Sequence, residues 1–356
     1  MHELLRVAGL PVLQNRVYGS RQAALQSPTG DMLLVQDEAS GLVFNHAFDP
    51  ERVVYDGNYQ NEQAHSGVFV RHLDKVLGIV GRHFTGTSVL EVGCGKALFL
   101  RRLREAGFDA TGIDPAYEGD EPWVLKHAFI PGLGLAADAI VLRHVLEHIR
   151  DPMAFLAGMA AANGGRGRIY IEVPCFDWIL AQRAWFDVFY EHVNYFRRSD
   201  FERMFATVHE SGTVFGGQYL FVVAELASLR PAPASPFERA VLPADFNAGI
   251  GACARIARAH AGRPLANWGA SSKGVIFAQQ TGREGIVFDA AIDINPAKQG
   301  RFLPVSGLEV LSPLAALQRL PGGSLVFVMN SNYFDEIVEQ SDNRFQYVKV
   351  DQHEFR

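Results

Sequence analysis

The sequence predicts an α/β protein with two doubly wound, mostly parallel sheets and a small module in front of them. Short apolar runs alternate with stretches of helical spacing from about residue 71, and a second alternating series follows a linker. Alternation of this kind is typical of parallel sheets whose strands are joined by crossover helices. A chain of 356 residues is also too long for one ordinary hydrophobic core. We therefore expect three parts, at 1–66, 67–228 and 229–356.

The first part is mixed in pattern. Short apolar runs at 32–35 and 41–44 are separated by turn-forming residues, which indicates a small irregular or β-rich module. No internal repeat and no low-complexity tract is visible in this part or in the rest of the chain.

The central part opens with a helix predicted over 68–84, where apolar residues recur at helical spacing. Buried strands and helices then alternate, and Gly107 ends one of the helices. Strands are predicted at 87–92, 109–114, 138–143 and 168–173 and, as an antiparallel pair, within 207–226. The remaining helices are predicted over 97–107, over 151–162 and from Ser199.

The last part begins after the clearest linker of the chain, PAPASP at 231–236. A long helical stretch over 237–260 precedes the second alternating series. Its strands are predicted at 264–270, 285–293, 324–330 and 345–350, with helices between them.

Composition excludes several classes of protein. Hydrophobic residues make up 48% of the chain and charged residues 20%, as in ordinary globular proteins. The formal charge of −6 argues against a nucleic-acid partner held by phosphate contacts. No apolar run reaches the roughly 20 residues of a membrane helix, and the N-terminus lacks the order of a signal peptide. The three cysteines have no CxxC spacing, so we expect a cytoplasmic chain without a membrane partner, a disulfide framework or a cysteine zinc site.

A glycine loop, EVGCGKA at 91–97, joins the first strand of the central part to its helix. Gly93 and Gly95 allow a sharp turn and the close approach of a ligand, and the helix start supplies free N–H groups. Asp114 ends the next strand, where an acid accepts hydrogen bonds from ribose hydroxyls in doubly wound folds. For the glycines alone, a tight turn without a ligand is the alternative interpretation.

The segment LRHVLEHIRDP at 142–152 adds a third signal. With Glu91 at the head of the glycine loop and Asp114, it resembles the cofactor site of class I S-adenosylmethionine methyltransferases, which have a Rossmann-like fold. The resemblance implies S-adenosyl-L-methionine as the cofactor and S-adenosyl-L-homocysteine as the product. Catalytic roles are not favoured for His144 and His148. A histidine with satisfied hydrogen bonds and a surface residue of a helix are the favoured interpretations. The cofactor-binding residues that the resemblance implies are Glu91, Gly93, Gly95, Asp114, Arg143 and His144.

A second glycine loop, WGASSKG at 268–274, again joins a predicted strand to a helix. Its small residues, its free backbone N–H groups and Lys273 could together cradle a phosphate. Simple capping of the helix by serine is the alternative interpretation.

The ordered set GASSKG, DINPAKQGRFLP and NYFDEI, with YEHVNYF earlier, resembles the deoxysugar C-methyltransferases over nearly the whole chain. Members have an N-terminal zinc module, a central methyltransferase domain and a C-terminal Rossmann-like domain, and they methylate a carbon of a nucleotide-linked keto sugar. The resemblance implies a small, phosphate-bearing nucleotide sugar as the partner. The substrate-binding residues it implies are Ser271, Ser272, Lys273, Asn295, Lys298 and Tyr333.

The N-terminal module departs from the family. The family binds zinc through two CxxC pairs, whereas the four matching positions here are Leu5, Ala8, Asp37 and Ser40. These residues cannot form a tetrahedral zinc site, so we expect no metal and an apolar core in its place.

The segment at 55–66 matches the place where family relatives carry a tyrosine-bearing lid. Tyr59 is the first candidate for a phenol that faces substrate or cofactor, and Tyr55 is the second. A polar loop that merely caps the following helix is the alternative interpretation.

The segment FDVFYEHVNYF at 186–196 matches the place where the family carries a Tyr-His-Glu-His motif. Either Phe189 replaces the family tyrosine or Tyr190 takes its role. We expect His192 to be the base that forms an enolate, Glu191 to hold its tautomer or polarise the substrate, and a phenol such as Tyr190 to stabilise the enolate oxygen. The same pair could deprotonate a hydroxyl or amine for O- or N-methylation. An inactive binding or scaffold protein and a plain aromatic core segment are further alternatives, and the acceptor atom and oligomeric state stay open.

Overall fold

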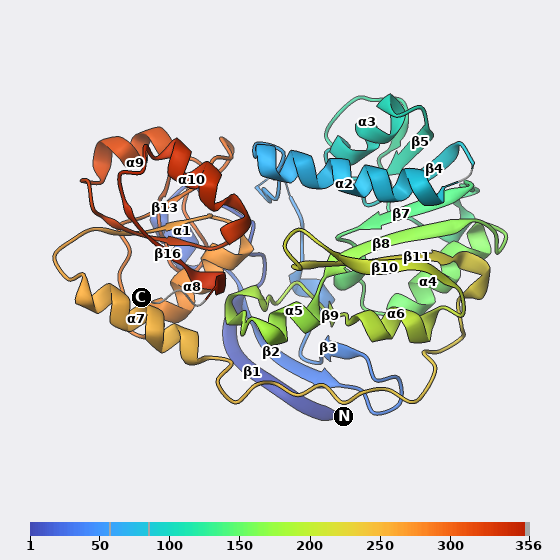
Figure 1. The fold of residues 1–356 in the computed structure, drawn as a ribbon, viewed down its shortest axis with the longest axis horizontal. Helices are drawn as coiled ribbons and strands as arrows, with labels where there is room; N and C mark the ends of the chain where they lie inside the picture. The colour runs from blue at the N-terminus through green and yellow to red at the C-terminus, as the bar shows by residue number, and fades with distance from the viewer. Residues whose placement is uncertain (57, 85, 353–356) are drawn as a thin grey trace.

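The computed structural model describes residues 1–56, 58–84 and 86–352, so Gly57 of the predicted lid and the end of the last predicted part lie outside the described residues. Three β-sheets with flanking helices form the chain, and the predicted α/β fold class is confirmed (Figure 1). The N-terminal sheet lies beneath the two α/β parts in that view, which face each other across the middle of the molecule.

The N-terminal module is a four-stranded antiparallel sheet in the order β1-β2-β3-β9. Its last strand comes from the aromatic segment that follows the fifth strand of the central sheet. Leu5, one of the four zinc-ligand positions of the family, is buried in an apolar core, and the Asp37 carboxylate accepts a hydrogen bond from the Ser40 backbone N–H at 2.7 Å. The bounds are β1 (His2–Pro11), β2 (Thr29–Gln36), β3 (Val43–Asn45) and β9 (Asn194–Tyr195). The β1 and β9 strands were not predicted.

The central sheet has seven strands in the order β10-β11-β8-β7-β4-β5-β6. The strands from β8 to β6 are parallel, and β11 pairs with β8 in the antiparallel direction. All predicted strands of this part are present, with shifts of one or two residues at their ends. The bounds are β4 (Ser88–Val92), β5 (Asp109–Ile113), β6 (Val124–Leu125), β7 (Ala139–Arg143), β8 (Arg168–Pro174), β10 (Val208–Val214) and β11 (Tyr219–Glu225).

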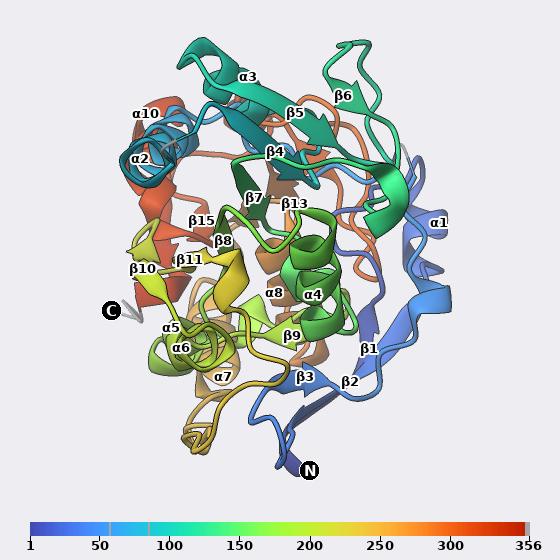
Figure 2. The same cartoon turned by 90° about the vertical axis from the view of Figure 1, so that its right-hand side faces the viewer.

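Helices cover both faces of the central sheet (Figures 1 and 2). Helices α2 and α3 lie on one face and α4 and α6 on the other. Because neighbouring residues of a strand point to opposite faces, each strand contributes side chains to both layers. Val89 thus packs with the α2 and α3 side chains, and Leu90 packs with those of α4 and α6. The bounds are α1 (Arg21–Leu25), α2 (Gly67–His83), α3 (Leu98–Glu105), α4 (Pro152–Ala162), α5 (Phe176–Ala181) and α6 (Arg198–Met204).

The C-terminal sheet is parallel throughout, in the order β14-β13-β12-β15-β16. This order places a topological switch point between β12 and β15, where ligands bind in open α/β sheets. The bounds of its elements are α7 (Ala248–Ala259), β12 (Leu265–Trp268), α8 (Ser272–Arg283), β13 (Ala290–Ile292), β14 (Val310–Leu311), α9 (Pro313–Arg319), β15 (Leu325–Val328), α10 (Phe334–Gln340) and β16 (Gln346–Lys349).

The helix predicted over 237–260 is wrong for its first half, since α7 begins only at Ala248. The residues before it form an irregular segment that runs along the N-terminal module. There the Gln36 side chain donates to the Glu238 carbonyl and accepts from the Ala240 N–H, so the backbone groups of this stretch are used outside a helix. Pro243 also lacks the N–H that a helix interior needs.

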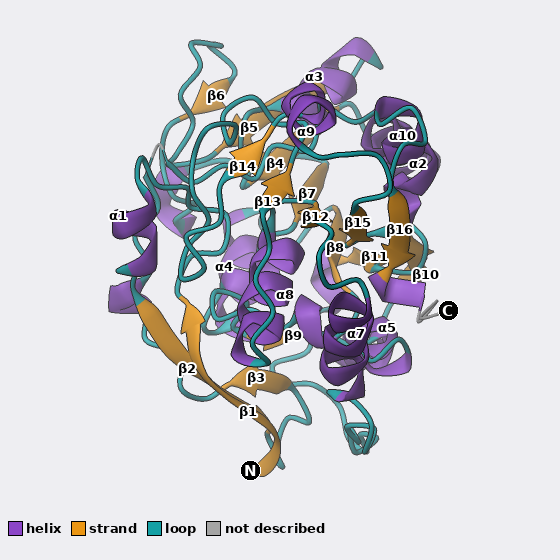
Figure 3. Cartoon of the chain, turned by 90° about the vertical axis from the view of Figure 1, so that its left-hand side faces the viewer, coloured by secondary structure: helices purple, strands orange, loops and turns teal. Residues whose placement is uncertain are grey.

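One hydrophobic core joins the N-terminal module to the C-terminal part. Leu10 and Met32 of the module, Trp185 and Phe186 of the aromatic segment, and Phe277 of α8 belong to this single cluster. Figure 3 shows α7 and α8 on the side of the C-terminal sheet that faces this core. In the described residues, no helix combines the length and apolar character needed to cross a membrane.

Gly30 in β2 tests how tightly the module packs on the aromatic segment. A Cβ at position 30 would lie 2.3 Å from the Tyr190 ring, so Gly30→Ala forces the ring or the strand to move. We expect a loss of about 1–3 kcal/mol in the free energy of unfolding, measured by denaturant titration. Gly78→Ala is the matched control, because Gly78 is exposed in α2 with no neighbour within 4 Å and should gain about 0.5–1 kcal/mol. Equal stability of the Gly30→Ala variant and the native chain would contradict this packing.

Candidate active site

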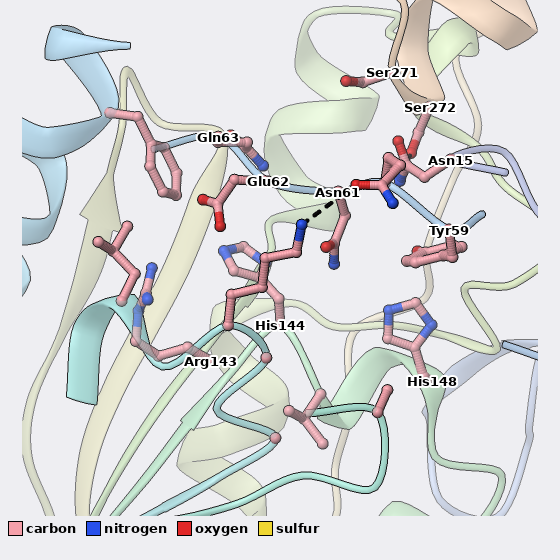
Figure 4. A pocket seen from close by; sticks show the side chains of 18 of the residues that line it. Asn15, Tyr59, Asn61, Glu62, Gln63, Arg143, His144, His148, Ser271 and Ser272 are labelled. Atoms are coloured by element: carbon pink, nitrogen blue, oxygen red, sulfur yellow. Dashed lines mark hydrogen bonds between the residues drawn. The ribbon is translucent and has the colours of Figure 1, made fainter. Parts of the chain in front are cut away.

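A cavity of about 1320 Å³ lies between the carboxyl ends of the central and C-terminal sheets. Both glycine loops line it, and so do the segment 53–56 and residues from Tyr59 to Gln63 of the predicted lid. Asn15 of the N-terminal module also reaches it, beside Ser272 (Figure 4). A drug-sized ligand occupies roughly 300–1,000 Å³, so this space can hold two ligands at once.

The first glycine loop has the backbone that its sequence predicts. Gly93 and Gly95 have φ angles of +74° and +52°, in the left-handed region that favours glycine. A Cβ on Gly93 would lie 2.3 Å from the Val145 side chain, so no larger residue fits there. The Gly95 N–H donates to the Asp114 carboxylate at 2.8 Å, which holds that acid at the mouth of the loop.

Arg143 and His144 line the cavity at the end of β7, and both are held by a buried acid that the sequence did not single out. The Glu172 carboxylate, on β8, accepts hydrogen bonds from Arg143, His144 and His72 at 3.1 Å each and from the Tyr170 hydroxyl at 2.6 Å. Burial raises the pKa of Glu172, but Arg143 and the two histidines outweigh burial and hold that pKa well below its usual range. An acid inside the apolar strand RIYIEV was the available signal.

His144 has a left-handed backbone, with φ of +54°, and bridges two carboxylates. Its Nε2 contacts Glu172 at 3.1 Å and its Nδ1 contacts Glu147 at 3.4 Å. Burial lowers the pKa of His144, but the two acids outweigh it and raise the pKa to about 9. His144 is therefore a cation at neutral pH.

His192 lines the same cavity, with its ring 4.7 Å from the Phe189 ring and 4.9 Å from the His148 ring. Its Nδ1 is buried and has no hydrogen-bond partner among the described residues. Burial holds the pKa of His192 well below its usual value, and the neighbouring His148 and His144 lower the pKa further. The imidazole is therefore neutral and can accept a proton.

Glu191 is buried behind the lid. Contrary to our expectation, its side chain does not hold the tautomer of His192. Its carboxylate accepts hydrogen bonds from the Tyr59 hydroxyl at 2.8 Å, the Tyr55 hydroxyl at 3.3 Å and the Gln14 N–H at 3.3 Å. Its backbone carbonyl instead accepts from His148 Nδ1 at 3.0 Å. Burial raises the pKa of Glu191. Both phenols also line the cavity. Their hydrogen bonds to Glu191 hold the lid in place.

The expectation for Tyr190 is wrong, since this side chain lies outside the cavity. Tyr190 is only 1% exposed, and its hydroxyl accepts a hydrogen bond from the Asp49 N–H at 2.9 Å. Phe189 faces the cavity in its place. The phenol is needed to pack the N-terminal sheet against the segment, and so it cannot reach an enolate.

Three of the six predicted substrate-binding residues do not offer the contacts that we expected. Lys273 lines the cavity, but its ammonium lies 3.0 Å from the buried Asp187 carboxylate and donates to Gln218, so its charge is already balanced. Lys298 is 1% exposed and supports the loop from below by donating to the Ala270 carbonyl and the Ser271 hydroxyl.

The Asn295 side chain caps the turn at 297 instead of lining the cavity. Ser271 and Ser272 line the cavity as expected. Tyr333 does so as well, and its hydroxyl donates to Gln63 of the lid at 3.1 Å.

Asn15 is a cavity residue that the sequence did not reveal. It is 8% exposed, its side-chain N–H donates to the Ser272 hydroxyl at 2.9 Å, and its Oδ1 has no partner among the described residues. Its backbone carbonyl accepts from the Gln60 N–H at 2.9 Å. The N-terminal module thus holds the lid and the second glycine loop together.

Tyr190→Phe separates a packing role from a catalytic one. The change removes the hydrogen bond to the Asp49 N–H and leaves the ring, so we expect a loss of about 1 kcal/mol in the free energy of unfolding. Denaturant unfolding measures this loss, and turnover should match that of the native chain. A variant of unchanged stability and much reduced turnover would show that the phenol acts in the cavity.

The chain is similar to known methyltransferases over most of its length. Residues 63–208 match a family model described as a methyltransferase domain, and residues 253–348 match a C-methyltransferase C-terminal domain. The C-methyltransferase NovU of Streptomyces niveus is 26% identical over 346 residues, which cover 84% of this chain and 79% of that protein. A ubiquinone biosynthesis O-methyltransferase of Parvibaculum lavamentivorans is 30% identical over 141 residues, 35% of this chain and 51% of that protein.

A solved structure of magnesium protoporphyrin IX methyltransferase from Synechocystis PCC 6803, with the methyl donor bound, is 15% identical. The match covers 44% of this chain and 79% of that one with a TM-score of 0.31, which is too low to support a conclusion. The chain is an S-adenosylmethionine-dependent methyltransferase, and its residues 253–348 are similar to the C-terminal domain of C-methyltransferases.

Proposed function

We propose that this enzyme methylates a carbon of a nucleotide-linked keto sugar through an enolate, with His192 as the base. The observation that carries the proposal is the neutral imidazole of His192, whose Nδ1 has no hydrogen-bond partner among the described residues, in a cavity that both glycine loops line. The match of the C-terminal part to a C-methyltransferase domain supports carbon as the acceptor. Similarity to NovU over most of both chains supports it further.

The residues of the first glycine loop fit the cofactor. Glu91 is 3% exposed, and its Oε2 has no partner among the described residues, so a buried carboxylate oxygen awaits a cationic group. The ammonium of the cofactor's methionine part is such a group. The Asp114 carboxylate suits the ribose hydroxyls, and the absence of a side chain at Gly93 allows close approach of the ligand. Bound S-adenosylmethionine supplies an electrophilic methyl group.

The chain's own residues handle the proton. His192 accepts it from the carbon beside the substrate carbonyl, a step for which a neutral imidazole is suited. Glu191 holds the lid beside the cavity, because it accepts hydrogen bonds from Tyr59 and Tyr55, whose ring centroids lie 4.8 Å apart. Burial raises the pKa of the Tyr59 phenol, so it stays protonated and keeps donating to Glu191. Phe189 adds an apolar wall that excludes water.

The second glycine loop supports a substrate with a nucleotide part. After the cofactor is accommodated, the cavity still has room for a ligand of similar size. Ser271 and Ser272 offer hydroxyls at the start of α8, and these groups suit phosphate oxygens.

O- or N-methylation is the second candidate. The similarity of the central part to ubiquinone biosynthesis O-methyltransferases, at 30% identity over 141 residues, favours it. His192 could take a proton from a hydroxyl in the same position. Analysis of the methylated product by NMR separates the two, because a new C–CH₃ group and a new O–CH₃ group have different chemical shifts.

Cofactor binding should release a proton from Glu91. Burial raises the pKa of Glu91 to about 8, with Arg143 opposing and Asp114 adding to the shift, so the carboxyl is mostly protonated at pH 7. A cationic ligand group beside it favours the carboxylate and lowers that pKa, so about one proton leaves on binding. Calorimetry with S-adenosylhomocysteine at pH 7 in buffers of different ionisation enthalpy measures the number released.

Glu91→Gln is the matched control, because the amide cannot release a proton, and its binding enthalpy should be the same in every buffer. A native enzyme whose binding enthalpy is also independent of the buffer would contradict the assignment of Glu91.

His192→Gln tests the base. We expect turnover to fall by at least about 100-fold, because the amide cannot accept the proton, while the affinity for S-adenosylhomocysteine stays close to that of the native enzyme. Release of S-adenosylhomocysteine from a panel of nucleotide-linked keto sugars measures turnover, and calorimetry measures affinity. The exposed His127 provides the control substitution, His127→Ala, which should leave both unchanged. Undiminished turnover of His192→Gln would remove His192 from the reaction.

A further inference from the structure

We propose that Glu147, His148 and His192 form a binding site for a divalent cation of the zinc class. One ligand atom from each of the three side chains lies within 4.8 Å of the other two. All three side chains line the large cavity, so a further coordination position would face the substrate. This site is separate from the zinc module of the family, whose ligand positions lie in the N-terminal sheet.

The backbones that carry the three residues are fixed to one another. Glu147 and His148 lie on the short 3₁₀ turn Leu146–His148, and His192 precedes β9. The Val193 N–H donates to the Glu147 carbonyl at 2.7 Å, and the Asn194 side chain donates to the Ile149 carbonyl at 2.6 Å. Ligands held on such a frame need only side-chain rotation to reach the separation of about 3.4 Å that zinc bonds of roughly 2.0–2.1 Å impose.

Each of the three side chains has a lone pair that can bind a cation. Glu147 is 1% exposed, and its Oε2 has no partner among the described residues, while Oε1 faces His144. His192 Nδ1 is likewise buried and without a partner in the described part of the chain. His148 Nδ1 lies 3.0 Å from the Glu191 carbonyl, which can only accept, so Nδ1 donates and Nε2 keeps its lone pair. An outer hydrogen bond of this kind orients most histidine ligands of metals.

The ligand set selects the class of ion. Calcium and magnesium prefer oxygen ligands alone, whereas two imidazoles and one carboxylate suit zinc and its neighbours in the first transition row. Three protein ligands with an open position are typical of zinc sites that exchange a bound ligand.

A bound cation takes the lone pair that His192 needs as a base. Saturating zinc should therefore stop methyl transfer, and a chelator should restore it. This consequence rests on the proposed role of His192, whereas cation binding itself does not.

The test uses the full-length, tag-free enzyme without substrate. Calorimetry should detect one Zn²⁺ per chain, and Co²⁺ should give the intense visible absorption of a four-coordinate site. Glu147→Gln and His148→Ala should each weaken Zn²⁺ binding by at least about 10-fold. His127→Ala, which removes an exposed histidine, should leave it unchanged. Binding of S-adenosylhomocysteine to each variant shows that the variant is folded.

Absence of stoichiometric Zn²⁺ binding, or of the Co²⁺ absorption in the native enzyme, overturns the proposal without any variant. Binding of equal strength in the native enzyme and in folded Glu147→Gln and His148→Ala overturns it as well. If zinc binds at this site but turnover continues at saturation, the cation site stands and His192 is not the base.

Discussion

The position of the reaction centre depends on one buried carboxylate. Glu172 lies at 0% exposure in the middle of the central sheet, where an unpaired charge would cost several kcal/mol. Four donors surround it, from α2, β7, β8 and the loop after β7. Because this acid holds Arg143 and His144 at the point where the chain leaves β7, it fixes the left-handed turn at His144. Val145, Glu147 and His148, which follow this turn, line the cavity.

The N-terminal module acts on the site although it lies outside both α/β parts. The loop after β1 places the Gln14 N–H on the Glu191 carboxylate and the Asn15 side chain on Ser272. The module can do this because its sheet takes β9 from the central part and shares a core with the C-terminal part. Apolar packing and strand pairing therefore position the module beside the cavity.

The sequence predicted the elements of the two α/β parts well, because apolar periodicity and glycine loops are local signals. The same signals singled out Gly93, Gly95, Asp114 and the loop at Ser271, which the structure then places on one cavity. The sequence could not predict which side chains of the segment 186–196 face the cavity, because an irregular segment has no regular alternation of side-chain directions. Only tertiary packing directs Phe189 toward the cavity and Tyr190 away from it.

Asn15 and Glu172 escaped the sequence analysis for related reasons. The contact between Asn15 and Ser272 joins residues that are 257 positions apart. Of the partners of Glu172, only Tyr170 lies on the same strand, whereas His72, Arg143 and His144 come from distant parts of the chain. Lys298 was assigned to the substrate from the family resemblance of the segment DINPAKQGRFLP, whereas in the structure it donates to the second glycine loop from beneath.

The charges around His192 show how the two halves of the proposed reaction depend on each other. Before transfer, one positive charge lies on the cofactor's sulfonium; afterwards, one lies on His192, so the net charge of the closed cavity is conserved. Burial, His148 and His144 all disfavour the charged imidazole, which makes the enolate costly to form and short-lived. The free oxygen of Glu147 lies in the same cluster and can stabilise that imidazolium. Repulsion between imidazolium and sulfonium disappears as the methyl group leaves, so proton removal becomes favourable only when transfer follows it directly. A divalent cation held by the same three side chains would place a permanent positive charge beside His192. The coupling between proton removal and methyl transfer would then be lost.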